Sequence, residues 1–351
     1  MSLTTSLKNI LLKLFLKCLK NEKIQQSLHD SIKLSKQDLG VLRNESNPYD
    51  HNINSGSNNQ ITSKRDDIVF ITSRFRSGST LLWNIFRNID GCTAYYEPFN
   101  ERRWFDKTSR GEHVDSTHIG VDDYSSEYDG MEHLDQYYQE DWIREGLFMD
   151  ANTWAPDMKS YICELINKAD GRPVLQFNRI DFRLPWLKQN FPNAKFIHLH
   201  RHPRDQWYSF LTDKKLMTKD NIETSYIDGF YLNSWCDDLA KHFPFLDQRT
   251  TTHPYKRFYY LWKLSYLYGK KESDQSISLK QLMQDPNTVL QDLFTELNID
   301  NMHLKQAASV IENQGVDKWK NFADNDWFEK LEQECETELT LFIDSLKNDN
   351  Q

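Results

Sequence analysis

The chain has 351 residues, with 43 lysine and arginine residues against 52 aspartate and glutamate residues, which gives a formal net charge of −9. This length holds one large α/β domain or two domains of ordinary size. Aromatic residues make up 13% of the chain, which excludes a disordered protein because disordered chains are poor in them. The acidic balance argues against a nucleic-acid partner, since such binding depends on lysine and arginine.

The first 66 residues differ in composition from the rest of the chain. Within residues 1–42, the stretch 7–20 interleaves lysines with apolar residues, as a basic amphipathic helix does. Such an arm either packs on the domain or on a partner, which we prefer, or makes a peripheral membrane contact. Residues 43–66 are polar and rich in asparagine and serine, which predicts a linker.

The cysteines and the hydropathy indicate where the protein is found. The chain has five cysteines and no CxxC pair, so we expect neither a disulfide framework nor a zinc site. It also lacks a run of about 18 apolar residues, the length that a transmembrane helix needs. We therefore expect a cytoplasmic protein in a reducing compartment, peripheral to a membrane if the arm at 7–20 binds lipid.

Residues 67–351 are predicted to form the main domain. The apolar run 68–71 indicates a buried strand, and it is followed by a loop of small and basic residues and then by an apolar helix. Residues 195–200 predict a second strand, and Pro203 suits the first position of the helix that follows. These units predict a three-layer α/β, P-loop-like fold, with a central parallel sheet and helices on both faces. Residues 101–170 are expected to form a helical insertion over the ligand-binding edge, on the acceptor side.

The loop after the first predicted strand has the composition of an anion site. Gly78 allows close backbone approach, the helix start offers unpaired N–H groups, and Ser77, Ser79 and Thr80 add hydroxyls. Arg76 adds a permanent charge with bidentate geometry. The alternative is an ordinary turn with a serine cap. A Walker A loop is disfavoured, because Ser79 stands where its lysine belongs.

A second anion site is predicted after the second strand. Arg201 leaves the strand end, and Ser209 follows about two helical turns later, so both side chains can face the same sheet edge. Taken alone, the motif has one alternative, an arginine and a serine on a surface helix.

Together the two motifs resemble those of sulfotransferases that use 3′-phosphoadenosine 5′-phosphosulfate (PAPS). Residues 76–80 (RSGST) are similar to the family's 5′-phosphosulfate loop, and residues 201–209 (RHPRDQWYS) to its 3′-phosphate motif. Weaker matches are residues 278–286 and 315–320. Phe75, Leu81 and His202 depart from the usual residues, and Leu81 stands where the cytosolic branch has an adenine-stacking tryptophan. The chain is thus nearer to the carbohydrate-modifying and bacterial branches.

The resemblance implies roles for these residues. Arg76 to Thr80 would hold the 5′ end of PAPS, Arg201 and Ser209 would hold its 3′-phosphate, and no metal would be needed. Glu97, in a Tyr-Glu-Pro string similar to that of the carbohydrate sulfotransferases, is the predicted base. A surface carboxylate that caps a turn before Pro98 is the alternative, and the histidines of the insertion, His113 and His118, are weaker candidates.

Further expectations concern Arg179 and the acceptor. Arg179 would stabilise sulfonyl oxygens, bind an acidic acceptor or pair with Asp181. The acceptor is expected to carry a hydroxyl or an amine, and the aromatic insertion favours a carbohydrate or glycolipid. The alternatives are a P-loop nucleotide-dependent kinase and a non-catalytic nucleotide-binding scaffold.

Overall fold

The computed structural model of the protein describes residues 63–311 and 317–348, which belong to one compact unit, Ile61–Gln351. The predicted arm at 1–42 lies outside the described residues, as do residues 43–62 of the predicted linker. The two domain boundaries therefore remain predictions.

A single parallel sheet organises the described part of the chain. Its strand order is β2-β3-β1-β4-β5, and every pairing is parallel. The strands are β1 (Val69–Ser73), β2 (Cys92–Tyr96), β3 (Arg172–Phe177), β4 (Lys195–His200) and β5 (Gln275–Ser278). The two strands expected from the sequence are β1 and β4, which lie side by side, with Ser73 opposite Leu199.

Helices cover both faces of this sheet. The α-helices are α4 (Ser79–Arg87), α5 (Pro156–Lys168), α6 (Leu184–Asn190), α7 (Pro203–Phe210), α8 (Ile222–Ser225), α9 (Leu232–Leu239), α10 (Pro254–Glu272), α11 (Leu279–Gln284), α12 (Pro286–Leu297), α13 (Leu304–Ser309) and α14 (Asn325–Asn348). The short 3₁₀ helices are η1 (Ser126–Tyr128), η2 (Glu132–Gln136), η3 (Glu140–Ile143), η4 (Asp181–Arg183), η5 (Pro244–Leu246), η6 (Asn301–His303) and η7 (Lys318–Asn321).

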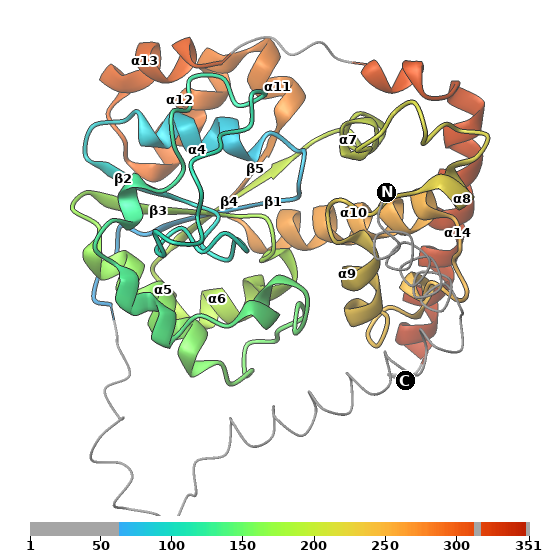
Figure 1. Ribbon diagram of the computed structural model, residues 1–351, viewed down its shortest axis with the longest axis horizontal. Coiled ribbons are helices and arrows are strands. Elements are labelled where there is room, and N and C mark those ends of the chain that lie inside the picture. Colours follow the sequence, from blue (N-terminus) through green and yellow to red (C-terminus); the bar gives the residue numbers. More distant parts are fainter. Residues whose placement is uncertain (1–62, 312–316, 349–351) are drawn as a thin grey trace, which may run out of the picture. The chain divides into compact units, whose positions relative to one another are not determined.

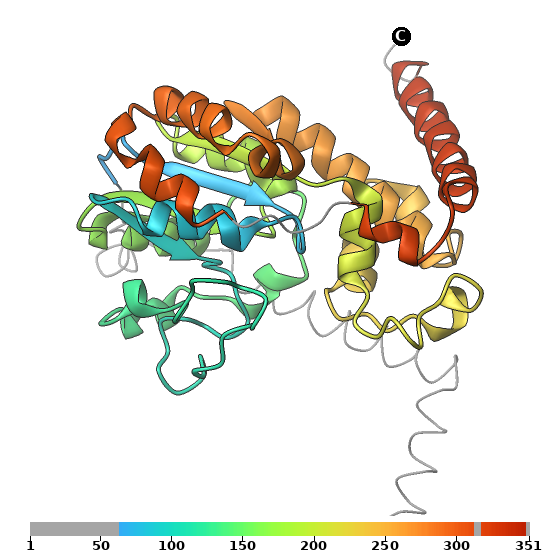
Figure 2. The ribbon, with the colours of Figure 1, turned by 90° about the horizontal axis from the view of Figure 1, so that it is seen from above.

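The helices and the sheet form three layers. Figure 1 shows α4 and α11–α13 on one face and α5 and α6 on the other. α10 contacts α6 and β4, and it also packs against α14 beyond the end of the sheet (Figure 2). One apolar core lies around the sheet, and a second lies among α7, α9, α10 and α14. The predicted fold class is therefore confirmed.

The strand order places the site. From β1 the chain runs to β2 and β3 on one side of the sheet, and then to β4 and β5 on the other. The order therefore reverses between β1 and β4, and parallel α/β sheets bind ligands at the carboxyl ends of the strands at such a point. Both predicted anion motifs begin there, because one follows β1 and the other follows β4.

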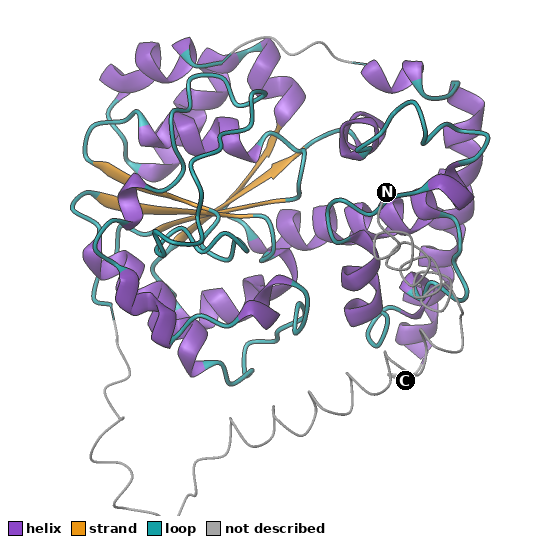
Figure 3. Cartoon of the chain, in the orientation of Figure 1, coloured by secondary structure: helices purple, strands orange, loops and turns teal. Residues whose placement is uncertain are grey.

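The segment 101–170 differs from its prediction as a helical insertion. Only α5 is an α-helix, and residues 101–155 consist of turns and loops with η1–η3 (Figure 3). Their aromatic and acidic residues mimic helical spacing, but four of the twelve glycines, Gly111, Gly120, Gly130 and Gly146, take positive φ angles here. These turns interrupt any long helix, since positive φ has no place in one.

None of the helices within 63–311 and 317–348 is long and apolar enough to cross a membrane. The cytoplasmic location and the membrane contact of the arm remain predictions.

His198 on β4 predicts an acid-labile fold. Its ring is buried beside Gly269 of α10, and burial lowers the pKa of the imidazole to about 3. An unfolded histidine titrates near about 6.5, so between these values only the unfolded state binds the proton. Stability should fall as the pH falls from about 6.5 to about 3, by up to about 1.4 kcal/mol per pH unit for this residue.

Urea unfolding of the wild type and of His198→Asn at several pH values tests this expectation. Asparagine keeps a polar group beside the Ser276 hydroxyl, which lies 2.9 Å from Nδ1 of His198. The wild-type stability should depend more steeply on pH than that of the variant. Parallel pH profiles would contradict a neutral buried His198.

Candidate active site

The turn between β1 and α4 depends on Gly78. This residue has φ +94°, a left-handed conformation that glycine adopts without steric cost. A Cβ atom at this position would lie 2.7 Å from Cδ1 of Leu279, at the start of α11. The backbone therefore turns sharply into α4 against the segment 278–286, which the sequence analysis had linked to the same site.

We expect Gly78→Ala to cost more stability than Gly91→Ala. Gly91 also has positive φ, +83°, but a Cβ there meets nothing within 4 Å. Both substitutions should cost about 1 kcal/mol for the left-handed backbone, and Gly78→Ala about 1–3 kcal/mol more for the overlap with Leu279. Denaturant unfolding measures both values, and equal losses would contradict the tight turn.

The side chains of this loop divide into two groups. Arg76, Ser79 and Thr80 line a pocket at the sheet edge, and the Thr80 hydroxyl lies 3.0 Å from that of Tyr96. The Ser77 hydroxyl instead donates to the carbonyl of Arg74 at 2.6 Å. Ser77 was expected to present its hydroxyl to an anion, but in the structure it holds the turn.

The two anion motifs meet directly. Nε of Arg76 donates to the Ser209 hydroxyl at 3.1 Å, and Arg201 donates from Nη1 to the carbonyl of Arg76 at 3.0 Å. Two separate anion sites were expected; the structure instead joins the motifs in one pocket. The reason is the adjacency of β1 and β4, whose carboxyl ends deliver the two loops side by side.

The shared pocket has a volume of about 600 Å³ and is lined by five lysine and arginine residues against four aspartate and glutamate residues. Lys214 and Lys318 line it together with Arg76 and Arg201. Burial lowers the pKa of Lys214, and the nearby charges of Arg76, Lys318 and Arg201 lower it further. Like charges held this close are stabilised by a bound anion.

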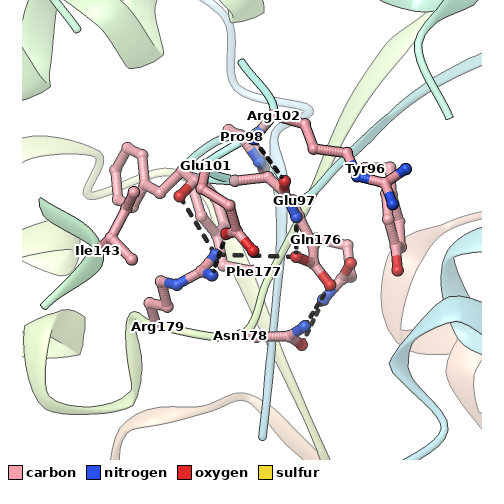
Figure 4. Close-up of polar contacts among 12 residues, drawn as sticks. Tyr96, Glu97, Pro98, Glu101, Arg102, Ile143, Gln176, Phe177, Asn178 and Arg179 are labelled. Carbon is pink, nitrogen blue, oxygen red and sulfur yellow. Dashed lines mark hydrogen bonds and ion pairs between the residues drawn. The ribbon is translucent and has the colours of Figure 1, made fainter. Parts of the chain in front are cut away.

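Glu97 lies in the wall of the same pocket and is 4% exposed. Figure 4 shows its side chain among those of Asn178, Arg179 and Glu101. The side-chain amide of Asn178 donates to its Oε1, and that of Asn100 donates to Oε2 at 2.7 Å. Nη1 of Arg179 lies 3.7 Å from Oε2. Burial raises the pKa of the Glu97 carboxyl, whereas the Arg179 charge and the Asn100 hydrogen bond oppose the rise.

The backbone of Glu97 is strained as well. Its φ is +38°, in the left-handed region that non-glycine residues rarely adopt. Strain of this kind costs about 1–3 kcal/mol and is concentrated at functional sites. A strained, buried carboxylate with three polar partners is not the turn-capping surface residue that was the alternative interpretation.

The sequence matches the profile of the sulfotransferase family over residues 68–262, more than half of the chain. The chain belongs to the sulfotransferase family. The family expected from the two motifs is confirmed, and with it an enzyme of sulfonyl transfer. The matched range contains both motifs and Glu97.

Solved structures similar to this sulfotransferase include three at low sequence identity. The sulfotransferase STF9 from Mycobacterium avium is 12% identical, with a TM-score of 0.43 over 84% of this chain and 80% of its own. Mouse sulfotransferase SULT7A1 complexed with PAP is 13% identical, with a TM-score of 0.40 over 82% and 91%. The sulfotransferase domain of the Synechococcus PCC 7002 olefin synthase is 17% identical, with a TM-score of 0.36 over 76% and 93%. No curated protein sequence matches significantly.

Arg179 has other partners in the structure than the ones expected from the sequence. Asp181 pairs with Arg74 at 3.0 Å rather than with Arg179. Arg179 is 2% exposed and donates to Glu101 at 2.8 Å and to the carbonyl of Phe99 at 3.1 Å. In this sulfotransferase Arg179 therefore forms ion pairs with the carboxylates of both Glu97 and Glu101.

Several residues of the site were not singled out from the sequence. Lys214 follows α7 in a polar loop without a recognisable motif. Lys318 belongs to the weak match at 315–320, of which residues 315 and 316 lie outside the described residues. Asp205 accepts the backbone N–H groups of Asp317 and Trp319 at 3.3 and 3.4 Å, and so holds η7 against α7. Lys318 lines the pocket, whereas Lys320 pairs with Asp317 at 3.1 Å.

Proposed function

We propose that the enzyme transfers the sulfonyl group of PAPS to a hydroxyl acceptor. The 5′ end of PAPS would lie on Arg76, Ser79, Thr80 and the backbone of the loop, with Ser77 shaping the turn. Arg201 and Ser209 would hold the 3′-phosphate, which ATP lacks. The observation that carries this proposal is the contact of Arg76 with Ser209 and Arg201, because it brings the basic residues of both anion motifs to one pocket.

The reaction needs positioning and charge stabilisation rather than a metal. As the acceptor oxygen bonds to sulfur, the bond from sulfur to the 5′-phosphate oxygen breaks, and adenosine 3′,5′-bisphosphate leaves. Negative charge then develops on the leaving phosphate. Arg76 and the N–H groups at the start of α4 suit this charge, since fixed donors stabilise a loose in-line transition state without reorganising.

We propose Glu97 as the base that takes the proton of the acceptor hydroxyl. Its raised pKa brings the carboxylate closer to the pKa at which proton transfer is efficient. Asn178 and Asn100 fix its two oxygens, so the carboxylate is held in one orientation in the pocket wall. An acceptor amine would lose its proton to the same group.

For the acceptor we favour a carbohydrate or glycolipid. Trp104, Tyr124, Ile119 and Val121 of the 101–155 segment line the pocket beside Arg102. A wall that combines aromatic, aliphatic and charged groups suits a ligand with both apolar ring faces and polar hydroxyls.

Transfer of labelled sulfonate from PAPS to a panel of acceptors, with and without EDTA, tests the proposal. We expect transfer to a hydroxyl acceptor, with carbohydrates and glycolipids among the best, at a rate that EDTA does not change. Turnover of ATP that requires Mg²⁺ would indicate a kinase instead. A protein that binds the nucleotide and transfers to no acceptor would be a scaffold.

A further inference from the structure

His118 contacts the anion loop from a segment that contains neither anion motif. It lies in the wall of the pocket, and its Nε2 is 3.2 Å from the Thr80 hydroxyl. Its Nδ1 is hydrogen-bonded to the hydroxyl of Tyr124. The same segment contacts the loop a second time, because Asp115 lies 3.7 Å from Nη1 of Arg76. Residues 115–124 therefore brace the loop at two functional side chains.

The hydrogen bonds around His118 have a preferred direction. The backbone N–H of Asp115 donates to the Tyr124 hydroxyl oxygen at 3.0 Å, which leaves the Tyr124 proton to be donated to Nδ1 of His118. Burial lowers the pKa of His118, so the ring is neutral at neutral pH and has one donor and one acceptor nitrogen. With Nδ1 as the acceptor, Nε2 carries the proton and donates to Thr80.

We propose that His118 is a positioning residue that directs the Thr80 hydroxyl hydrogen toward the 5′ end of the bound nucleotide. Because Oγ1 of Thr80 accepts from Nε2 of His118, its own hydrogen is not used in the contact with the ring. The Tyr96 hydroxyl, 3.0 Å away, either donates to the same oxygen or accepts that hydrogen, and a bound 5′-phosphate is the stronger acceptor for it. This inference rests on the proposed placement of the 5′-phosphate at the loop.

A pair of ligands isolates the 5′ contact without any acceptor. Calorimetry gives the Kd of adenosine 3′,5′-bisphosphate and that of adenosine 3′-phosphate, and their ratio reports the 5′-phosphate alone. We expect Thr80→Val to reduce the wild-type ratio by about tenfold, as the loss of a hydrogen bond to a charged group does. His118→Leu should reduce it by about three- to tenfold. The double variant should match Thr80→Val, because His118 acts only through Thr80.

Conservative variants separate positioning from a structural role. His118→Gln keeps a donor within reach of Thr80, whereas the shorter His118→Asn keeps only the contact with Tyr124. The ratio should therefore stay near the wild-type value in His118→Gln and fall in His118→Asn, a comparison that also decides the question if His118→Leu does not fold. His113→Leu is the matched control, since His113 is exposed in the same segment and does not line the pocket.

The outcomes distinguish the two proposals. A wild-type ratio near one would remove the proposed 5′ site itself, and with it the function. A large wild-type ratio that His118→Leu and His118→Asn leave unchanged would overturn only the role of His118. Effects of Thr80→Val and His118→Leu that multiply in the double variant, or an equal loss in His113→Leu, would overturn it too.

Discussion

Replacing Glu97 by glutamine should lower kcat by about 10²- to 10⁴-fold, the usual contribution of a positioned general base. Glutamine has nearly the same shape, so the loop after β2 and the pocket wall should persist, although one of the two amide donors, Asn178 or Asn100, loses its acceptor. It has no basic oxygen, however, and the acceptor proton is left without a carboxylate to receive it. Binding of adenosine 3′,5′-bisphosphate should stay unchanged, because its proposed site is formed by the loops after β1 and β4.

Glu101→Gln is the matched control for this experiment. Both carboxylates pair with Arg179, but the Glu101 side chain is 44% exposed and that of Glu97 only 5%. If Glu97 is the base, Glu101→Gln should change kcat by less than about tenfold, as expected for an exposed ion pair. Comparable losses in the two variants would point to the positioning of Arg179 rather than to a base, and a fully active Glu97→Gln would remove Glu97 from the mechanism.

Replacing Arg76 by alanine should lower kcat by about 10²- to 10³-fold, the effect of removing one donor that faces developing charge. Arg76 has φ +65°, and Arg201 holds its backbone carbonyl. Its guanidinium is held by the Ser209 hydroxyl and by Asp115, so it is positioned before the substrate binds. The proposed contact of Arg76 with the 5′-phosphate strengthens as this leaving group gains charge. The substitution should therefore lower kcat more than it lowers the affinity for the nucleotide. Steady-state kinetics with PAPS as the varied substrate measures both quantities.

Arg102→Ala is the matched control for Arg76. Arg102 also lines the pocket, but it belongs to the 101–155 segment and donates to the carbonyl of His113 at 2.8 Å. The Arg102 substitution should alter KM for the acceptor and leave kcat within about tenfold of the wild type, because it removes binding that is equal in the ground and transition states. If the two substitutions lowered kcat equally, Arg76 would have no special role in charge stabilisation.

The sequence predicted the two strands that present the anion motifs and missed the other three. β1 and β4 are apolar runs followed by a turn, a pattern typical of buried parallel strands. β3 contains Pro173 and the buried Gln176, and β5 is a short edge strand with the polar residues Gln275 and Ser276. The strand structure of β3 and β5 comes from pairing in the sheet rather than from local propensity.

The same contrast between local sequence pattern and pairing in the sheet explains which residues of the site could be predicted. Arg76, Arg201 and Glu97 belong to recognisable strings, so each could be predicted as a site residue. That both anion motifs share one pocket follows from the adjacency of β1 and β4, which the strings do not show. Asn178 follows β3, and its approach to Glu97 depends on the pairing of β2 with β3, which the sequence pattern did not reveal. Lys214 faces the pocket only because the loop after α7 returns to it, and loop paths of this kind have no periodic signal.

The central claim is that one pocket recognises both phosphates of adenosine 3′,5′-bisphosphate. Its most direct test is calorimetry with this nucleotide and with adenosine 5′-phosphate (AMP), which lacks the 3′-phosphate. We predict that the wild type prefers the bisphosphate by about 100-fold or more, since two hydrogen bonds to a charged phosphate each contribute about 1.5–3 kcal/mol. The preference should fall to about tenfold or less in Arg201→Ala. Equal affinities for the two nucleotides, or a preference that Arg201→Ala leaves intact, would contradict the account.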